Sequence, residues 1–594
     1  MQMIPFIPET APFDTDQRLW LNGYMAGLLA GKNFVPANAN GTDNGPAAAT
    51  VPLLVLFGSQ TGTAEKLARR IAKESKPRGC NSRVADAAEY AKIDWSKETN
   101  LLVVTSTYGD GDMPDNAQAF WDWLQTDAAK SLSHLNFSVL ALGDTNYENF
   151  CAAGKKIDAR LEALGAKRIH PFADCDLDYE AKAKEWTTGA LAALAPNAHA
   201  TGATDAANIE TENPLRSSRP LCEEISKSNP FSARLLANRR LNADGSQKET
   251  RHFEISLEGS GLNYEVGDAL GVWPANCPEL VGEILRALGA TGDEVVKISG
   301  GEFPFRQALL EKLDLGRPTT ELLQFFSRSN SALRDLIAPE RKDDLKKWLW
   351  GRGVIDLLLE NPAVKVPAAE FIALLKPLAP RLYSIASSPK AHAGQVHLTV
   401  SIVRYESFGR ARKGLASAFL ADRAGGEIPV PVFIQTSHGF RLPADGNTPI
   451  IMVGPGTGVA PFRAFLHERR AAAAPGKNWL FFGEQHAAVD FYYRDELEKM
   501  FSDGHLTKLC TAFSRDQAEK IYVQHRMLEH AAGLWSWLQD GAHFYICGDA
   551  SRMAKDVDDA LHKIIETAGG KSADDAKTYV AKMKAEKRYQ RDVY

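Results

Sequence analysis

Three continuous apolar runs, each followed by an amphipathic segment, mark the first third of the chain. The runs are LLVLFGS (53–59), NLLVVTST (100–107) and FSVLALGDT (137–145). Runs without polar alternation are typical of strands that a parallel sheet buries on both faces. The segments that follow them have helical spacing: TAEKLARRIAKES, NAQAFWDWLQTD and FCAAGKKIDARLEALGA. The pattern therefore predicts a doubly wound parallel sheet over residues 53–195.

Beyond residue 230 the pattern changes. ARLLANRRL, TRHFEISLEG and QVHLTVSIVRY alternate apolar and polar positions, which predicts antiparallel strands and a barrel over 227–275 and 375–443. Helical spacing in PELVGEILRALGA and TTELLQFFSRS predicts a helical insert over 276–374. The strand–helix rhythm returns over 444–594, in NWLFFGE and HFYICGDASRMAKDV, and predicts a second parallel sheet.

Length and composition agree with several globular domains. The chain has 594 residues, and a single hydrophobic core stops growing near ~250–300 residues. A hydrophobic content of 44% with 24% charged residues excludes a disordered or collagen-like protein, and no run reaches the ~18 apolar residues of a membrane span. The net charge of −5 gives no reason to expect nucleic acid as a partner. Seven cysteines without a CxxC pair exclude a disulfide framework and predict no metal site, which favours a reducing cytoplasm.

Two segments have the composition of linkers. Residues 14–31 have the spacing of a short amphipathic helix, and an Asn-, Gly-, Pro- and Ala-rich stretch follows up to residue 52. This helix either serves assembly, giving a homo-oligomer, or packs back on the first domain, and the sequence favours neither. Residues 196–226 predict a second, flexible linker. The N-terminus lacks the basic and apolar regions of a secretory signal.

Three loops at the carboxyl ends of the first strands carry the chemistry of a flavin site. GSQTGTAEK (58–66) offers small hydroxyl residues and a helix N-terminus to a phosphate, without the lysine of a nucleoside triphosphate loop. STYGDGDMPDN (106–116) and LGDTNYENFC (142–151) each carry a tyrosine that can cover a planar ring, Tyr108 and Tyr147. Such loops meet in one crevice in a doubly wound sheet. Any one of them alone is as well explained by a plain turn, but the three together predict flavin mononucleotide (FMN).

A second flavin site is predicted in the barrel. In RLYSIASS, Arg381 can clamp a diphosphate, Tyr383 can stack on a ring and Ser384 can hydrogen-bond the ring edge. GRARKGLAS (409–417) ends in a glycine turn and helix start that suits the same diphosphate. The first motif has little specificity by itself, and its pairing with the second inside a barrel favours FAD.

The last domain has the pattern of a nicotinamide dinucleotide site. In VGPGTGVAPF (453–462), three glycines allow close approach of a dinucleotide, although GxGxG matches the usual fingerprint only in part and a tight turn without ligand is the alternative. SRDQAEKIYVQ (514–524) gathers two cations, a hydroxyl and an aromatic ring, which suits the 2′-phosphate of NADPH; an isolated charge run is usually a solvated face. Cys547 ends a strand, where packing is the usual role of a cysteine. The tail RYQRDVY lies where most chains fray.

The order of these motifs resembles that of the diflavin reductases over nearly the whole chain. RLYSIASS, GPGTGVAPFRAF, GKNWLFFGE, SRDQAEKIYVQ, DGAHFYICGDASRMAKDV and YQRDVY are similar to the flavoprotein (alpha) subunits of NADPH-dependent assimilatory sulfite reductase, and QRLWLNGYMAGLL is similar to their leading assembly helix. STYGDGDMPDNAQAFWDWL is more similar to the FMN loop of microsomal monooxygenase reductases. The N-terminus has no hydrophobic anchor of the microsomal type, which favours the sulfite reductase interpretation.

The resemblance implies a multidomain α/β and β fold. It consists of a flavodoxin-like doubly wound parallel sheet, an antiparallel FAD-binding β-barrel with a helical connecting insert, and a C-terminal ferredoxin-reductase-like NADP-binding α/β domain. The implied FMN residues are Ser59, Gln60, Thr61, Gly62, Thr63, Ala64, Ser106, Thr107, Tyr108, Gly109, Leu142, Gly143, Asp144, Thr145, Asn146, Tyr147, Glu148, Asn149, Phe150 and Cys151. The implied FAD residues are Thr319, Arg381, Leu382, Tyr383, Ser384, Thr399, Val400, Ser401, Tyr405, Gly414, Leu415, Ala416 and Ser417. The implied NADPH residues are Gly456, Thr457, Ser514, Arg515, Lys520, Ile521, Tyr522, Val523, Gln524 and Asp556, with Arg239 a weaker candidate.

The resemblance also implies roles and an activity. Ser384, Cys547 and Asp592 are expected to orient and stabilise hydride transfer, and Tyr594 to stack on the flavin and yield to nicotinamide. Electrons are expected to pass from NADPH to FAD, to FMN and then to a sirohaem and iron–sulfur subunit, because this chain has no cysteine set for such a cluster. The FMN domain is expected to swing on its linker. The alternatives are donation to a monooxygenase haem protein or another cytochrome, and a binding module joined to an inactive reductase.

Overall fold

The computed structural model describes residues 50–594 apart from 60–61, 109–110, 127–128, 130–131, 144–148, 177–178, 195–224, 299–300 and 438. The helix expected at 14–31 lies outside these residues, as does nearly all of the linker expected at 196–226. Within the described part of the chain, no helix is both long and apolar enough to cross a membrane.

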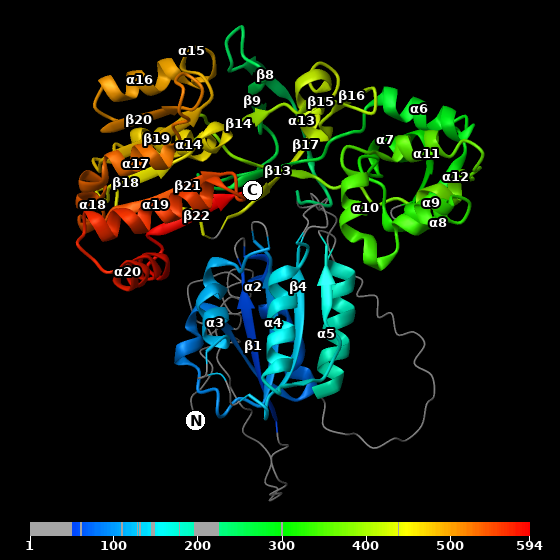
Figure 1. Ribbon diagram of the computed structural model, residues 1–594, viewed down its shortest axis with the longest axis horizontal. Coiled ribbons are helices and arrows are strands. Elements are labelled where there is room, and N and C mark those ends of the chain that lie inside the picture. The colour runs from blue at the N-terminus through cyan, green and yellow to red at the C-terminus, as the bar shows by residue number, and fades with distance from the viewer. Residues whose placement is uncertain are drawn as a thin grey trace, which may run out of the picture. The chain divides into compact units, whose positions relative to one another are not determined.

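The first sheet is parallel, with strand order β2-β1-β3-β4-β5 and with β6 beside β4 (Figure 1). Val55 of β1 enters a core shared with α2 and α5, and the next residue, Leu56, enters a core shared with α3 and α4. Successive side chains of a strand point to opposite faces, so a strand buried on both faces needs an unbroken apolar run. The elements are β1 (Val51–Gly58), α2 (Thr63–Ser75), β2 (Cys80–Asp86), β3 (Asn100–Ser106), α3 (Asp115–Leu124), β4 (Asn136–Leu142), α4 (Ala152–Ala163), β5 (Lys167–Arg168), β6 (Ala173–Cys175) and α5 (Glu180–Leu194).

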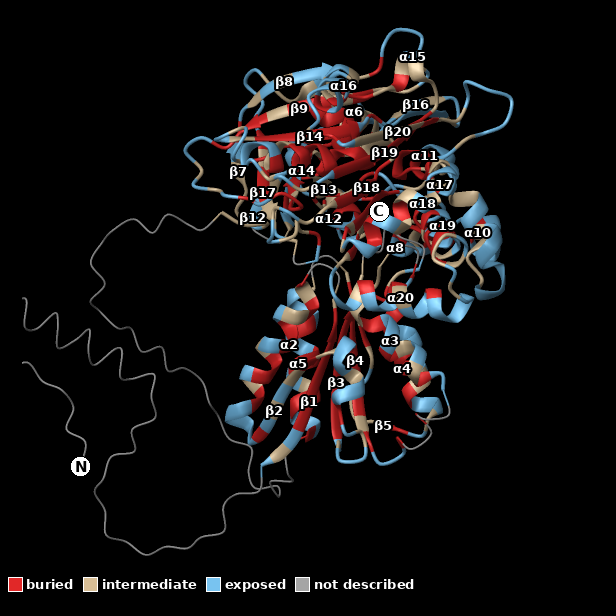
Figure 2. Cartoon of the chain, turned by 90° about the vertical axis from the view of Figure 1, so that its left-hand side faces the viewer, coloured by how far each residue is buried: buried red, intermediate tan, exposed pale blue. Residues whose placement is uncertain are grey.

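The burial pattern makes this arrangement visible. In Figure 2, most of β1 and β3 is buried, whereas α2 and α4 each expose one face. The loops that follow β1, β3 and β4 all start from the carboxyl edge of the sheet, where ligands bind in this kind of fold.

The barrel is built from two antiparallel sheets, β13-β10-β17-β7 and β14-β9-β8. Apolar side chains of both sheets, such as Phe253 and Val432, share one core, and a bridge between Ile385 and Leu398 joins the sheets. The strands are β7 (Phe231–Ala233), β8 (Leu235–Arg240), β9 (Thr250–Ser256), β10 (Ala269–Val272), β13 (Arg381–Ser384), β14 (Gln395–Ser401) and β17 (Val430–Gln435). The hairpin β15 (Arg404–Ser407) with β16 (Arg410–Lys413) and the short helix α13 (Leu415–Ala418) follow β14.

The insert between β10 and β13 is mainly helical and has its own core. It also contains a hairpin, β11 (Val295–Ile298) with β12 (Gly301–Pro304), which the helical pattern did not predict. Its four residues on each side are too few for a clear strand period. The helices are α6 (Pro278–Leu288), α7 (Phe305–Glu311), α8 (Thr320–Ser327), α9 (Ser331–Leu336), α10 (Lys342–Leu349), α11 (Val354–Glu360) and α12 (Ala368–Ala373).

The last sheet is parallel, with strand order β20-β19-β18-β21-β22, and helices cover both faces. Its strands are β18 (Ile450–Val453), β19 (Asn478–Glu484), β20 (Lys508–Phe513), β21 (His543–Gly548) and β22 (Tyr589–Val593). The helices are α14 (Ala460–Ala471), α15 (Ala487–Asp490), α16 (Arg494–Ser502), α17 (Val523–Glu529), α18 (Ala531–Gln539), α19 (Met553–Thr567) and α20 (Ala573–Ala585).

The end of the chain differs from the sequence prediction. The tail RYQRDVY does not fray but forms β22, which pairs in parallel with β21 from Phe544 to Gly548. Tyr589 is buried in the sheet core, which explains why the segment is ordered. The predicted fold class, with two parallel sheets, an antiparallel barrel and a helical insert, is confirmed.

Candidate functional site

Three predicted catalytic residues meet where the barrel joins the last sheet. The Ser384 hydroxyl at the end of β13 donates a hydrogen bond of 2.6 Å to Oδ2 of Asp592, and the Cys547 thiol of β21 donates to the same oxygen at 3.7 Å. Cys547 and Asp592 are register partners in β21 and β22. Residues separated by 208 positions in sequence therefore converge on one carboxylate.

Burial raises the pKa values of both acidic side chains at this junction, Asp592 and Cys547. Burial raises the pKa of Asp592, and the hydrogen bonds from Ser384 and Cys547 oppose that shift. Burial and the neighbouring Asp592 carboxylate raise the pKa of Cys547 well above its usual value, so the thiol stays protonated and remains a donor.

Tyr594 lies beside the dinucleotide turn. Its hydroxyl is 2.8 Å from Oγ1 of Thr457, and its N–H donates to the Gly548 carbonyl at 3.1 Å. The side chain is 51% exposed although the backbone is fixed. The structure therefore brings Tyr594 and Thr457 together, with an aromatic ring left open to a partner.

The glycines of this turn have different roles. A Cβ at Gly458 would lie 2.0 Å from the Cys547 carbonyl oxygen, and one at Gly454 would lie 2.5 Å from the Gly458 carbonyl oxygen. Packing within the protein by itself requires glycine at these two positions, and the prediction that they also serve ligand approach stays a prediction. Gly456, with φ of +60°, is the one that leaves room for a ligand, because a Cβ there would have only the Glu484 side chain nearby, at 3.6 Å.

The residues predicted for the 2′-phosphate follow β20. The N–H groups of Ser514 and Arg515 donate to the carbonyls of Glu484 and Gln485, each at 2.9 Å, and this fixes the turn. The side chains of Arg515 and Lys520 are exposed, as two phosphate-binding cations need to be. The Gln524 amide donates to Asp556 at 3.1 Å, so these two predicted residues also meet.

Two other residues predicted to bind NADPH pack in the core of the last domain. Val523 is buried in the core beneath α17, and Ile521 packs against the same core. Tyr522, in contrast, is 42% exposed at the start of α17.

The predicted FAD residues lie on the barrel and its neighbouring turns. Arg381, Leu382 and Tyr383 belong to β13, and Gly414 precedes α13, whose Ser417 hydroxyl accepts the Val403 N–H at 3.2 Å. Ser401 ends β14 and is exposed. Burial raises the pKa of Tyr383, which keeps its hydroxyl protonated.

Several FAD predictions point inward. Thr399 is buried, with its hydroxyl 2.6 Å from the Tyr493 hydroxyl, and Val400 is buried in the barrel core. Thr319 lies in the insert, where its hydroxyl accepts the Leu322 N–H at 3.0 Å as the cap of α8 and donates to the Leu374 carbonyl.

Hydroxyl side chains of the FMN loops accept hydrogen bonds from backbone N–H groups at the starts of two helices. The Ser59 hydroxyl accepts the N–H groups of Gly62 at 2.9 Å and Ala64 at 3.3 Å, at the start of α2. Thr107 accepts the Ala153 N–H at 3.3 Å, which ties the second loop to α4. Gln60, Thr61, Gly109 and the segment Asp144–Glu148 lie outside the described residues.

The second and third FMN loops converge as predicted for carboxyl-end loops. A Cβ at Gly111 would lie 2.6 Å from the Asn149 Cβ, so the two loops touch. Cys151 is buried, has φ of +56° at the start of α4, and has its pKa raised to about 12 by burial. The Tyr108 hydroxyl accepts the Val593 N–H at 3.1 Å.

Comparison with known proteins agrees with each of these regions. Residues 55–186 match the flavodoxin family, 223–419 the FAD binding domain and 452–559 the oxidoreductase NAD-binding domain. The chain is 45% identical to the sulfite reductase (NADPH) flavoprotein alpha-component of Bacillus subtilis, over 100% of this chain and 97% of that protein. The proteins of the same name from Mannheimia succiniciproducens and Vibrio cholerae are 42% and 41% identical, over 99% and 98% of this chain and 99% and 94% of theirs.

The chain belongs to the family of sulfite reductase flavoprotein alpha-components. The predicted resemblance to diflavin reductases is thereby confirmed, as are the flavodoxin, FAD-binding and nicotinamide-dinucleotide-binding domains.

The exposed aromatic and apolar side chains of this family member fit bound cofactors. Four of its large exposed hydrophobic residues are predicted cofactor contacts: Leu382, Tyr405, Tyr522 and Tyr594, each between 42% and 51% exposed. Exposure leaves these four side chains available to flat ligands. Nine other large hydrophobic residues of the described part, such as Trp350 at 84%, are also exposed and have no predicted cofactor role. The exposure of the four is an observation on the protein itself that suits flavin and dinucleotide binding.

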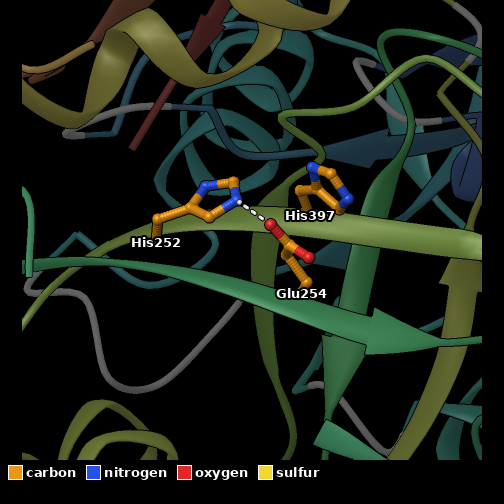
Figure 3. A group of neighbouring side chains, drawn as sticks. All are labelled: His252, Glu254 and His397. Carbon is orange, nitrogen blue, oxygen red and sulfur yellow. Dashed lines mark hydrogen bonds and ion pairs between the residues drawn. The ribbon is translucent and has the colours of Figure 1, made fainter. Parts of the chain in front are cut away.

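The sequence predicted no metal site, and it gave no indication of a histidine cluster that lies between the barrel and the last sheet. Figure 3 shows His252, Glu254 and His397, whose ligand-type atoms lie within 4.8 Å of one another. His252 contacts the Tyr493 hydroxyl through Nδ1 at 2.9 Å and Glu254 through Nε2 at 3.2 Å. His397 contacts Arg463 through Nδ1 at 3.4 Å and Gln395 through Nε2 at 3.2 Å.

These contacts make the cluster a hydrogen-bond network. Burial and Arg463 lower the pKa of His252 to about 3 and that of His397 to about 2, so both rings are neutral. His392 and His467 extend the network to Glu496, which also pairs with Arg463. All four nitrogens of His252 and His397 contact protein groups, and the nearby guanidinium disfavours an added cation.

Sequence reasoning also missed Glu484 and Lys248. Glu484 ends the quoted strand NWLFFGE at the carboxyl edge of the sheet, and that position was the available signal. Lys248 lies in an ordinary polar hairpin and carried no signal of its own.

Proposed function

We propose that this chain oxidises NADPH and passes the electrons through FAD and FMN to a haemoprotein subunit that holds sirohaem and an iron–sulfur cluster. The meeting of Ser384, Cys547 and Asp592 carries the proposal, because it joins the FAD-binding barrel to the dinucleotide sheet at one buried carboxylate. The name shared by the relatives supports sulfite reductase as the system that receives the electrons.

The protein groups at this junction suit hydride removal. Loss of hydride leaves the nicotinamide ring with a positive charge, and a fixed carboxylate stabilises developing positive charge most strongly where water is excluded. Asp592 provides this carboxylate, and the hydroxyl of Ser384 and the thiol of Cys547 hold the carboxylate in place by donating hydrogen bonds to it. Bound flavins supply the step from two-electron to one-electron transfer.

Tyr594 suits the role of a cover. Its backbone is fixed by the hydrogen bonds with Gly548 and Ala550, while its ring is half exposed beside Thr457. We infer that the ring covers the FAD until nicotinamide takes its place, and that the remaining predicted residues hold the cofactors as the resemblance implies.

The setting of the protein is part of the proposal. Within the described part of the chain no cysteine forms a disulfide, which supports a reducing cytoplasm. We further infer assembly through the helix expected at 14–31 and movement of the FMN domain on the linker expected at 196–226, both on the composition of those segments.

The test is anaerobic reduction of the purified, flavin-loaded chain. NADPH is expected to bleach the flavin absorbance within seconds, and addition of the haemoprotein subunit and sulfite is expected to restore it while sulfide forms. A chain whose flavin absorbance does not respond to NADPH would contradict the proposal.

The same assay distinguishes the haemoprotein subunit from a second candidate electron acceptor. The loop STYGDGDMPDN resembles that of monooxygenase reductases, so a soluble cytochrome is the comparison acceptor. Reoxidation of the flavins by the cytochrome at a rate well above that with the haemoprotein subunit would favour the monooxygenase system instead.

A further inference from the structure

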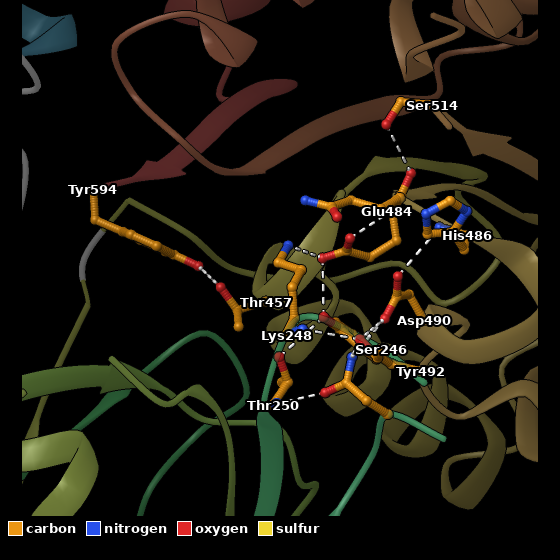
Figure 4. Close-up of polar contacts among 12 residues, drawn as sticks. Ser246, Lys248, Thr250, Thr457, Glu484, His486, Asp490, Tyr492, Ser514 and Tyr594 are labelled. Atoms are coloured by element: carbon orange, nitrogen blue, oxygen red, sulfur yellow. Dashed lines mark hydrogen bonds and ion pairs between the residues drawn. The ribbon is translucent and has the colours of Figure 1, made fainter. Parts of the chain in front are cut away.

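Two consecutive tyrosines of the last domain reach into the barrel. Tyr492 and Tyr493 lie between α15 and α16, and both side chains are buried. The Thr250 hydroxyl of β9 donates to the Tyr492 hydroxyl at 2.9 Å (Figure 4). The Tyr493 hydroxyl lies 2.6 Å from the Thr399 hydroxyl of β14 and 2.9 Å from Nδ1 of His252 in β9. The two tyrosines therefore hold both strands from a different domain.

The contacted positions are neighbours in the barrel. Strands β9 and β14 pair antiparallel, with Thr399 opposite His252 and Ser401 opposite Thr250. Residues two apart on a strand share a face, so the two tyrosine hydroxyls reach adjacent cross-strand pairs on one face of these strands. The segment of β14 that these pairs enclose is Thr399–Ser401, which the resemblance predicts to bind FAD.

The side chains of this segment limit what it can offer to FAD. The Thr399 hydroxyl faces Tyr493 of the last domain, and Val400 is buried in the barrel core. Only Ser401 is exposed. A cofactor at this segment is therefore held mainly by the backbone, and the position of that backbone depends on what its buried side chains contact.

Tyr493 is itself held firmly. It has φ of +57°, a left-handed conformation that a residue with a side chain adopts only where its surroundings determine it. The Arg463 guanidinium lies 4.9 Å from the ring centroid and pairs with Glu496 at 2.8 Å. Burial raises the pKa of Tyr493 to about 12, so its hydroxyl stays protonated and can both donate and accept.

The residues just before the tyrosines are also fixed to the barrel. Asp490 accepts hydrogen bonds from Asn242 at 2.8 Å and from Ser246 at 2.5 Å (Figure 4). The Ala243 N–H donates to the Val489 carbonyl at 2.9 Å. These contacts and those of the two tyrosines form one continuous interface between the barrel and the last domain.

We propose that Tyr492 and Tyr493 form a clamp that fixes the FAD-binding segment Thr399–Ser401 relative to the dinucleotide domain. Hydride transfer needs reacting atoms held about 3–3.5 Å apart, and here the two reacting groups bind to different domains. The clamp sets their separation, and Tyr493 is a positioning residue that acts through Thr399. The inference rests on the proposed function, since it assigns FAD to the barrel and NADPH to the last domain.

The experiment is anaerobic stopped-flow reduction of the flavin-loaded chain by NADPH, using Tyr493→Phe, Thr399→Val and the double variant. Each single change removes one side of the same hydrogen bond with little change of shape. Each is expected to slow FAD reduction about tenfold, because a small misplacement of reacting groups has a large effect on rate. Since both changes remove one shared contact, the double variant is expected to be within about twofold of the slower single variant.

Two further measurements locate the loss in the hydride step. NADPH deuterated at C4 is expected to slow FAD reduction in each variant at least as much as in wild type, because hydride transfer itself is impaired. Calorimetric titration is expected to give NADP⁺ affinities within about twofold of wild type, because this contact leaves the residues predicted to bind NADPH intact.

Amide hydrogen exchange gives a readout that does not depend on activity. In Tyr493→Phe and Thr399→Val, the amides of Thr399–Ser401 are expected to exchange roughly fivefold faster, the effect of one lost hydrogen bond. The amides of β1 in the flavodoxin domain are expected to exchange as in wild type.

Tyr579→Phe is the matched control. The Tyr579 hydroxyl donates to the Leu538 carbonyl at 3.2 Å within the last domain, so this change removes a tyrosine hydroxyl without altering the clamp. Its rate of FAD reduction and its exchange at Thr399–Ser401 are expected to match wild type. Equal slowing in this control would overturn the inference.

Other results would also overturn it. One is FAD reduction by both Tyr493→Phe and Thr399→Val within twofold of wild type, and another is unchanged exchange at Thr399–Ser401. A slower rate with an isotope effect near 1 would place the loss in a different step. Loss of FAD from both variants would make the contact a requirement for FAD binding instead of positioning. If wild type itself is not reduced by NADPH, the proposed function fails rather than the clamp.

Discussion

Both parallel sheets of this chain carry their candidate site residues at the carboxyl edge, but the two sites differ in which domains contribute those residues. In the flavodoxin domain, all candidate residues lie between Ser59 and Cys151, and the described contacts there are hydrogen bonds of hydroxyl and backbone groups. In the last domain the site is shared, because Ser384 and Lys248 come from the barrel and meet Asp592 and Glu484.

The difference teaches which part can act independently. A site made from one contiguous segment keeps its geometry when the segment moves as a unit. A site made from two domains keeps its geometry only while both stay together. We therefore expect the hydride step to depend on the barrel junction and FMN binding to depend on the flavodoxin domain, with Tyr108 as an exception because its hydroxyl accepts the Val593 N–H of the last domain.

The largest effect is expected from Asp592→Asn. This change removes the buried negative charge but keeps the shape, and it is expected to slow FAD reduction by NADPH on the order of 100-fold, as for loss of a fixed charge at a reacting centre. Anaerobic stopped-flow absorbance measures this rate. FMN content is expected to stay at one per chain, because the flavodoxin site shares none of these residues.

Asp574→Asn is the control for that variant. Asp574 lies on α20 with a side chain 96% exposed, so its replacement is expected to leave the rate unchanged. A rate for Asp592→Asn within threefold of wild type would contradict the assigned role.

A smaller effect in the other half is expected from Gly111→Ala. Gly111 has φ of +97°, and the added methyl would lie 2.6 Å from the Asn149 Cβ, so the two FMN loops must separate. Strain of about 1–2 kcal/mol corresponds to roughly a tenfold loss of FMN affinity. Fluorescence titration of the FMN-depleted chain measures it, while FAD reduction by NADPH is expected to be normal.

Gly79→Ala separates the clash from the backbone conformation. Gly79 has φ of +80° and nothing within 4 Å of an added Cβ, and it precedes β2 at the opposite edge of the sheet. Its FMN affinity is expected to match wild type. Equal FMN loss in both variants would show that loop contact at Gly111 is not the cause.

A separate effect is expected on acidification. His252 and His397 have pKa values of about 3 and 2 in the folded protein, against 6.5 for an ordinary histidine. The unfolded chain therefore binds protons below pH 6.5 that the folded chain excludes, and stability falls as pH drops from 6.5 toward 3. Between pH 7 and pH 5 the loss is roughly 1–2 kcal/mol for each histidine.

The flavodoxin domain serves as an internal reference for the loss of stability on acidification. His134 of the flavodoxin domain is exposed and His170 is half-buried, so that domain carries no comparable pair among its described residues. The temperature of FAD release is expected to fall more than that of FMN release between pH 7 and 5, and His252→Gln is expected to reduce the difference. Parallel shifts for both flavins would exclude the histidine network as the cause.

The sequence was sufficient to predict those strands, helices and loops whose pattern lies within one continuous segment. The buried runs at β1, β3 and β4 predicted the first sheet because each strand is apolar on both faces. The motif loops were recognised because their turn residues and helix starts lie together, as in RLYSIASS and VGPGTGVAPF. The residues predicted for hydride transfer came from resemblance, and the structure brings three of them together.

What the sequence could not predict depends on pairing across long separations. Strand β22 is half polar and becomes a strand only because β21 offers an open edge beside it. The ion pair between Lys248 and Glu484 spans 236 residues and has no local pattern. The roles of Gly454 and Gly458 likewise depend on a neighbouring carbonyl that no spacing rule locates.

The buried thiol of Cys547 has a consequence for the chemical durability of the enzyme. Thiolates, not thiols, react with peroxides and alkylating reagents. Because burial and Asp592 keep Cys547 protonated, the residue is a slow target even beside a redox centre. Cys277, partly exposed at the start of α6, is the better handle for attaching a probe, and a chain labelled there should retain an unmodified reaction centre.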